Sequence, residues 1–150
     1  MYCIGVLGLW HLGSVITVSW AKQGFNVICF DHDKKILNRL RKGKPAIYEP
    51  GLEESFQELI NENKIQIATN INQLSECNFV FLTYDTPVND KDESDISILE
   101  KSVIELGNVM RNSSCLIISS QSPLGVCTYL REKLQNLNSN LELAYSPENL

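Results

Sequence analysis

Short apolar runs recur along the chain, separated by longer segments in which apolar positions repeat with a helical period. Several runs are apolar at successive positions, for example at residues 27–30 and 79–82. Strands covered on both faces have this pattern, which is typical of a parallel sheet between helices. Six strands are expected, at residues 2–7, 26–30, 65–68, 78–83, 115–119 and 142–144.

The segments between these runs have the spacing of amphipathic helices. Five helices are expected, at residues 11–23, 34–42, 52–63, 95–111 and 125–137. In the fourth, Leu99, Val103 and Leu106 fall on one stripe, and Ser94 or Asp95 is the expected N-cap. Strands that alternate with helices of this length form right-handed βαβ units. The pattern predicts an α/β fold in one domain over residues 1–150: a Rossmann-like, doubly wound, mostly parallel six-stranded sheet with helices on both faces.

Length and composition narrow the class of protein. The 150 residues suffice for one domain, and no apolar run approaches the roughly 18 to 20 residues that cross a bilayer. The net charge of −5 argues against nucleic acid or an anionic membrane as the main partner. The five cysteines are far apart and mostly lie in apolar runs, which indicates reduced, buried thiols in a cytoplasmic protein. With two histidines and no C-x-x-C pair, no metal site is expected.

The first expected strand leads into a glycine turn. Gly8 ends the strand, and Gly13 follows five residues later on the first turn of the next helix. They fit the outer glycines of a G-x-G-x-x-G turn, whose helix N-terminus points free N–H groups at a pyrophosphate. Asp31 follows the second strand, where a carboxylate accepts hydrogen bonds from ribose hydroxyls and repels a 2′-phosphate. The sequence therefore predicts a dinucleotide site that prefers NAD to NADP.

Trp10 stands where the middle glycine of this turn is expected. That glycine normally lets the backbone approach the pyrophosphate, so two arrangements are open. Either the indole fills the phosphate space and the site has lost its function, or the indole points away and the neighbouring backbone still donates. His11 is equally open. It adds a hydrogen bond or charge to a phosphate, or it caps the helix at the surface.

Further polar clusters follow the later strands or lead into helices. They are YEPGLEE at 48–54, TYDTP at 83–87, SSQSPLG at 119–125 and SPENL at 146–150. A single proline after a strand commonly just ends it. Ligands of open α/β sheets bind beyond the carboxyl ends of the strands, so the four clusters together predict a site there.

Together these stretches resemble the UDP-glucose/GDP-mannose dehydrogenase family, and specifically its N-terminal NAD-binding domain. VLGLWHLG resembles the family's V-I-G-L-G-Y-V-G, and EPGL is identical to a family signature. YDTPV with SDIS resembles V-x-T-P with P-D-L-S, SSQSPLGV resembles S-T-V-P-P-G-T, and SPENL resembles S/N-P-E-x-L. The similarity runs from Val6 to Leu150.

The resemblance implies an enzyme that oxidises the C6 hydroxymethyl group of a nucleotide sugar to a carboxylate. Two hydrides pass to NAD, and the intermediates are a thiohemiacetal and a thioester on a cysteine. The implied cofactor contacts come from Gly8, Leu9, Trp10, His11, Leu12 and Gly13 at the pyrophosphate, Asp31 at the ribose, Thr83, Tyr84, Asp85, Thr86 and Pro87 at the adenosine and ribose, and Ser120, Gln121 and Ser122 at the nicotinamide. Glu148 and Gln121 take the positions of residues that act on water during thioester hydrolysis.

The chain also departs from the family. Trp10 and Gln121 replace a glycine and a threonine, and no cysteine has the glycine-rich G-x-x-C setting of the family's catalytic cysteine. We therefore expect a cofactor domain that lacks the central helix and the C-terminal substrate domain and is inactive alone. The nucleotide sugar and the homodimer belong to the full-length enzyme. Two alternatives stay open: a non-catalytic Rossmann module for binding or assembly, and another NAD-dependent hydroxyacid-type dehydrogenase.

Overall fold

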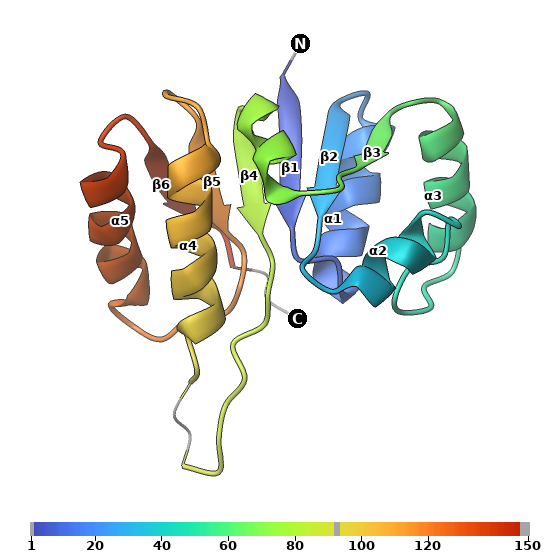
Figure 1. The fold of residues 1–150 in the computed structure, drawn as a ribbon. Coiled ribbons are helices and arrows are strands. Elements are labelled where there is room, and N and C mark those ends of the chain that lie inside the picture. The colour runs from blue at the N-terminus through green and yellow to red at the C-terminus, as the bar shows by residue number, and fades with distance from the viewer. Residues whose placement is uncertain (1, 92–93, 148–150) are drawn as a thin grey trace.

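The fold is built around one parallel sheet whose strands are the apolar runs of the sequence. The computed structural model describes residues 2–91 and 94–147. The strands are β1 (Cys3–Leu7), β2 (Asn26–Phe30), β3 (Ile65–Ile67), β4 (Phe79–Leu82), β5 (Cys115–Ile118) and β6 (Glu142–Tyr145). They lie in the order β3-β2-β1-β4-β5-β6 (Figure 1), and every pairing is parallel. The predicted Rossmann-like fold is confirmed, and the sheet is all parallel rather than mostly parallel.

Helices connect the strands on both faces of this sheet. They are α1 (His11–Lys22), α2 (Lys34–Leu40), α3 (Leu52–Asn61), the 3-10 helix η1 (Ile71–Glu76), α4 (Ser97–Val109) and α5 (Val126–Leu137). Helix α1 packs on β1, β2 and α3, whereas α4 packs on α5 and η1 (Figure 1). The strand order reverses between β3 and β4, so right-handed crossovers place these two groups of helices on opposite faces.

The expected helices are all present, and their ends differ from the expected ones by at most two residues. The largest change is in α4, whose N-cap is Ile96 rather than Ser94 or Asp95. The Asp95 carboxylate accepts a hydrogen bond from the Ser97 N–H at 2.9 Å, so it stabilises the turn that precedes the helix. The 3-10 helix η1 was not expected, because a helix this short has no apolar repeat to reveal it.

The sheet is less covered on the α1 side of β4 and β5 than on the α4 side. Both strands alternate between buried residues, such as Val80, and half-buried ones, such as Phe81. The Phe81 ring lies 5.9 Å from the ring of Trp20 in α1, centroid to centroid, so the half-buried residues face α1. In contrast, β1 and β2 are buried at four successive positions. The expected burial on both faces therefore holds for β1 and β2 and not for β4 and β5.

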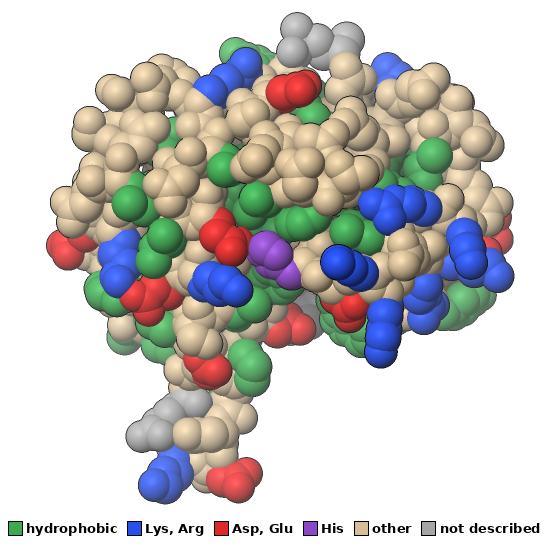
Figure 2. All heavy atoms as spheres, in the orientation of Figure 1, with side chains coloured by type: hydrophobic (Ala, Val, Ile, Leu, Met, Phe, Trp, Pro, Cys, Tyr) green, Lys and Arg blue, Asp and Glu red, His purple; other side chains and the backbone are tan. Residues whose placement is uncertain are grey.

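Basic side chains gather at one place on the surface. Six of the thirteen Lys and Arg residues lie within residues 34–44, in and just after α2. Figure 2 shows these charges on the side of the molecule that α2 occupies in Figure 1, while acidic side chains are spread over the rest of this view. Among the described residues, no helix is long and apolar enough to cross a membrane.

Candidate functional site

The turn between β1 and α1 is a tight reversal at the carboxyl end of the sheet. Gly8 has a φ of +99°, and its N–H donates to the carbonyl of Phe30 in β2 at 3.0 Å. A Cβ on Gly8 would lie 3.0 Å from Thr83 Oγ1 and 3.1 Å from the Tyr84 backbone nitrogen. Both the backbone conformation and the limited space therefore favour glycine at this position.

Gly13 lets α1 approach the end of β1. A Cβ on Gly13 would lie 1.7 Å from the carbonyl oxygen of Gly8 and 2.6 Å from Thr83 Oγ1. Those distances are far inside van der Waals contact, and the nearer atom belongs to the backbone. The helix can therefore start this close to the strand only if residue 13 is glycine, which confirms the packing role predicted from the sequence.

Thr83 supports this turn from the protein interior through hydrogen bonds. Its side chain is buried, and its hydroxyl donates to the carbonyl of Gly8 at 2.5 Å, with the Leu7 carbonyl also 3.2 Å away. The Thr83 N–H donates to the Leu7 carbonyl at 2.9 Å, as a continuation of the ladder between β1 and β4. The hydroxyl of Thr83 is therefore directed at the turn itself, within the interior of the protein.

We expect Thr83→Val to lower the free energy of unfolding by about 1–2 kcal/mol, because the buried Gly8 carbonyl loses its hydroxyl donor while the side-chain volume is kept. Thr83→Ser retains the hydroxyl and is the control. Urea denaturation of the two variants measures the difference. Equal stability of the two variants would contradict this account of Thr83.

Asp31 joins the turn to the end of β2. Its carboxylate is buried, and Oδ2 accepts a hydrogen bond from the Leu9 N–H at 2.6 Å. Oδ1 accepts from the Asp33 N–H at 2.8 Å, and the Tyr84 hydroxyl donates to the same oxygen at 3.4 Å. Burial and the charge of Asp31 raise the pKa of Tyr84, so the phenol stays protonated and able to donate. Asp31, the residue predicted to bind the ribose, thus also stabilises the glycine turn.

The N-terminus of α1 has the features of an anion site. The first intrahelical bond runs from the Ser14 N–H to the Trp10 carbonyl, so the N–H groups of His11, Leu12 and Gly13 have no partner within the helix. No side chain caps this end, and its first turn contains no acidic residue. Helix α3 differs, because Glu53 and Glu54 occupy its first turn. The dipole and the free donors of α1 therefore fit a phosphate group, which supports the pyrophosphate assignment.

Trp10 and His11 lie at the start of α1, next to this candidate anion site. Trp10 is the N-cap of α1 and is 51% exposed, so the indole is not packed into the protein interior. His11 Nε2 lies 2.6 Å from Oε1 of Glu49, and both side chains are partly exposed. Neither of the two roles considered for His11 includes this contact. It connects the helix start to the EPGL segment, which the sequence analysis could place only as a separate cluster.

The loops that follow β4 and β5 are tied to each other. The Ser120 hydroxyl donates to the Tyr84 carbonyl, and the Thr86 hydroxyl donates to the Gln121 carbonyl. The Ser122 N–H donates to the Tyr145 hydroxyl at 3.2 Å. The TYDTP and SSQSPLG clusters, far apart in sequence, therefore form one surface at the carboxyl end of the sheet.

Three further residues were predicted to belong to the site: Asp85, Pro87 and Glu148. Asp85 and Pro87 are exposed, and residues 84–91 extend beyond the end of β4 (Figure 1). The Pro87 carbonyl accepts a hydrogen bond from the Asp95 N–H at 2.8 Å, which closes the base of this loop. Glu148, the predicted water-activating residue, lies outside the described residues.

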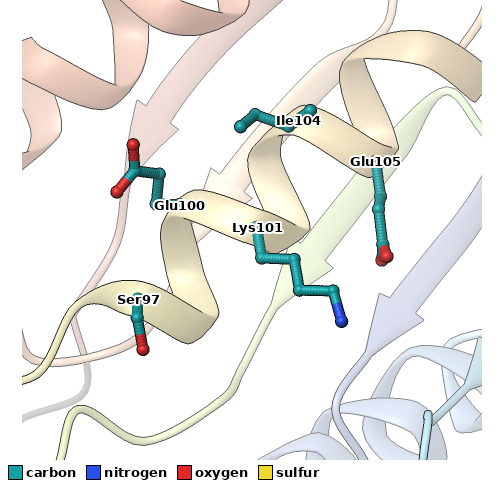
Figure 3. A pocket seen from close by; sticks show the side chains of 5 residues that line it. All are labelled: Ser97, Glu100, Lys101, Ile104 and Glu105. Atoms are coloured by element: carbon teal, nitrogen blue, oxygen red, sulfur yellow. The ribbon is translucent and has the colours of Figure 1, made fainter.

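Two hollows border these elements. A small cavity of about 180 Å³ lies beside α1 and the ends of β4 and β5, lined by Leu12, Ile16, Phe81, Ser119, Ser146 and Pro147. A larger one of about 270 Å³ is lined by a single helix, α4, and Figure 3 shows its five side chains diverging rather than converging on a point. One of these side chains, Glu105, lies beside the residue that follows Asp31: its Oε2 is 2.8 Å from His32 Nε2, without hydrogen-bond alignment. The smaller cavity is the better candidate for part of the site, because it lies between the start of α1 and the carboxyl ends of β4 and β5.

Three contacts that shape the site leave no trace in the local sequence pattern. They are the buried support from Thr83, the bond from Tyr84 to Asp31, and the pair His11–Glu49. Each joins residues at least 38 positions apart, so no local spacing could reveal it. Across residues 2–91 and 94–147, no group of His, Cys, Asp and Glu is arranged to hold a metal ion.

Comparison with known proteins agrees with this geometry. The family model described as "UDP-glucose/GDP-mannose dehydrogenase family, NAD binding domain" matches residues 2–150. UDP-N-acetyl-D-mannosamine dehydrogenase of Pyrococcus horikoshii is 26% identical over 150 residues, which is 97% of this chain and 36% of that protein. UDP-glucose 6-dehydrogenase of Pseudomonas aeruginosa is 27% identical over 128 residues, 85% of this chain and 28% of that protein.

A solved structure has the same architecture. The UDP-D-ManNAc dehydrogenase of Pyrococcus horikoshii superposes with a TM-score of 0.93 at 25% identity, over 99% of this chain and 36% of that one. The chain thus spans about a third of the length of the relatives it matches.

Proposed function

Since this chain belongs to the UDP-glucose/GDP-mannose dehydrogenase family, matching its NAD-binding domain, we propose that it binds NAD at the turn between β1 and α1. In this proposal the domain serves an enzyme that oxidises the C6 alcohol of a nucleotide sugar to a carboxylate. The oxidation itself requires residues beyond the NAD-binding domain, and the chain alone is inactive toward a nucleotide sugar.

One observation carries the proposal. The carboxylate of Asp31 and the uncapped N-terminus of α1 are held together by the hydrogen bond from the Leu9 N–H, at 2.6 Å. This unit presents an acceptor for ribose hydroxyls next to donors for a pyrophosphate. The two parts of an adenosine diphosphate are spaced in the same way, because its ribose and pyrophosphate are adjacent.

In this proposal, each segment of the site contacts a particular part of NAD. The turn from Gly8 to Gly13 holds the pyrophosphate through the backbone N–H groups of α1, and the exposed Trp10 indole and His11 lie at its border. Residues 83–87 lie along the adenosine and its ribose. Ser120, Gln121 and Ser122 lie at the nicotinamide end, near the cavity lined by Leu12 and Phe81. NAD, when bound, accepts a hydride from the substrate carbon.

Glu148 and Gln121 are proposed to act later in the reaction, on water. A carboxylate at residue 148 accepts a proton as water attacks a thioester, and the Gln121 amide orients that water. Both roles require the complete enzyme.

Cofactor selectivity tests the proposal. We expect NAD⁺ to bind the purified chain at least about tenfold more tightly than NADP⁺, a difference of about 1.4 kcal/mol, because the buried Asp31 carboxylate repels a 2′-phosphate. Isothermal titration calorimetry with each cofactor measures both affinities. Equal affinities, or preference for NADP⁺, would show that Asp31 does not read the ribose. Binding without oxidation of a nucleotide sugar by the complete enzyme would favour the non-catalytic alternative.

A further inference from the structure

Two cysteines lie in contact at the amino end of the sheet, opposite the candidate cofactor site. Cys3 begins β1, Cys77 lies two residues before β4, just after η1, and their Sγ atoms are 3.4 Å apart. The residues are 74 positions apart in sequence, so only the pairing of β1 with β4 brings them together. The proposed cofactor site does not use either thiol.

The backbone around the two thiols is well fixed. The Asn78 N–H donates to the Cys3 carbonyl at 2.9 Å, and the Cys3 N–H donates to Oδ1 of Asn78 at 3.0 Å. Strands about 4.8 Å apart, with a rise of about 3.3 Å per residue, place the Cα atoms of Cys3 and Cys77 about 6 Å apart. Disulfides span Cα separations of about 4.4–6.8 Å, so the bond requires side-chain rotation and no strand movement.

Space for the Cys77 side chain comes from a glycine in the neighbouring strand. A Cβ on Gly5 would lie 3.1 Å from Cys77 Sγ and 3.3 Å from Cys77 Cβ. Gly5 thus leaves room over β1 for this thiol. The side chain of Cys77 is fully buried there, whereas Cys3 is half buried.

A cavity gives solvent access to Cys3. It has a volume of about 240 Å³, and its polar lining includes Asn26, Lys64 and Glu76 beside Cys3. The hydrogen bond between the two thiols is the main cause that lowers the pKa of Cys3. The charge of Arg111 also lowers this pKa, whereas burial and the charge of Glu76 raise it. The pKa of Cys77 is raised, chiefly by the same hydrogen bond and by burial. Cys3 is therefore the better nucleophile, and Cys77 is the thiol placed to react next.

We propose that Cys3 and Cys77 are a redox-active pair that hydroperoxides convert to a disulfide linking β1 to the start of β4. The Cys3 thiolate attacks one oxygen of hydrogen peroxide, the O–O bond breaks, and the released hydroxide takes up the thiol proton as water. The Cys77 sulfur then attacks the sulfenic sulfur of Cys3, the S–O bond breaks, and the oxygen leaves with a proton as water. In total, two thiols and one peroxide give one disulfide and two waters.

The purified chain treated with stoichiometric hydrogen peroxide tests this pair. We expect the intact mass to fall by two hydrogens, and peptide mapping without reductant to find the peptides of Cys3 and Cys77 joined. The urea midpoint of unfolding should rise on oxidation, because the cross-link restricts the unfolded chain, and return after dithiothreitol. Cys3→Ser, at a half-buried position, should abolish both the mass change and the midpoint shift.

Cys115→Ser and Cys127→Ser are matched controls. Both thiols are half buried, and burial raises the pKa of each. Each control should still form the linked peptide. Peroxide that oxidises Cys3 only to sulfinic or sulfonic acid, or links that join other cysteines at equal yield, would overturn the proposal.

Discussion

Gly13→Ala is expected to lower the free energy of unfolding by about 3 kcal/mol and to remove NAD binding. The added Cβ would lie 1.7 Å from the Gly8 carbonyl oxygen, so α1 must move away from β1 or the turn must open. Overpacking of this kind typically costs about 1–3 kcal/mol, and a backbone contact cannot be relieved by rotating a side chain. Because the same movement displaces the free N–H groups of α1, the pyrophosphate loses its donors.

Gly107→Ala is the matched control for this substitution. Gly107 is also a buried helical glycine, in α4, but the atoms nearest to its Cβ would be side-chain atoms of two leucines: Leu137 Cδ1 at 3.0 Å, Leu134 Cδ1 at 3.2 Å and Leu137 Cβ at 3.4 Å, the last an ordinary contact. Those side chains can shift by a few tenths of an ångström, and alanine gains up to about 1 kcal/mol in helix propensity. Thermal unfolding should separate the two variants by roughly 10 °C. Similar melting temperatures for both variants would contradict the close approach at Gly13.

Asp31→Ala should weaken NAD binding at least about tenfold and destabilise the protein by about 2 kcal/mol. The affinity falls because the ribose loses a charged acceptor, and hydrogen bonds to charged groups contribute about 1.5–3 kcal/mol each. Stability falls for a separate reason, since the N–H groups of Leu9 and Asp33 lose the carboxylate that they donate to. Calorimetry with NAD⁺ and urea denaturation measure the two effects.

Asp33→Ala separates these effects. The Asp33 carboxylate accepts from the Lys35 N–H at 2.7 Å and caps α2, so its loss should cost about 1 kcal/mol of stability. Its side chain is exposed and has no contact with the glycine turn among the described interactions. NAD affinity should therefore stay unchanged in this variant. An equal loss of affinity in both variants would mean that local charge, and not the ribose contact of Asp31, determines binding.

Local sequence patterns were enough to predict most of the fold. Successive apolar residues, as in β2, reveal a strand buried on both faces, and Gly24 and Gly43 mark the ends of α1 and α2 with positive φ values. The patterns gave a wrong expectation where tertiary packing determines which face of a strand is covered. Phe79 and Phe81 look like residues of a doubly covered strand, yet β4 is only half covered on the α1 side.

The position of the candidate site could be predicted from the sequence, but the contacts within it could not. The spacing of Gly8, Gly13 and Asp31 predicted a turn and an acid at one edge of the sheet, because parallel strands end together. It could not reveal that the carboxylate of Asp31 is bonded to the Leu9 N–H, or that Thr83 supports the turn. Such contacts depend on strand order and side-chain rotation, which a linear pattern does not contain.

The proposed cofactor site holds NAD although Trp10 stands in the place of a glycine. Energy transfer from tryptophan to bound NADH tests it most directly, in a Trp20→Phe variant that leaves Trp10 as the one donor. Trp20 packs against Phe25 and Phe81 within the protein, so phenylalanine is a tolerable replacement. We predict saturable transfer that NAD⁺ reverses and NADP⁺ reverses poorly. Absence of transfer up to about 1 mM NADH, a binding free energy weaker than about −4 kcal/mol, would contradict the claim.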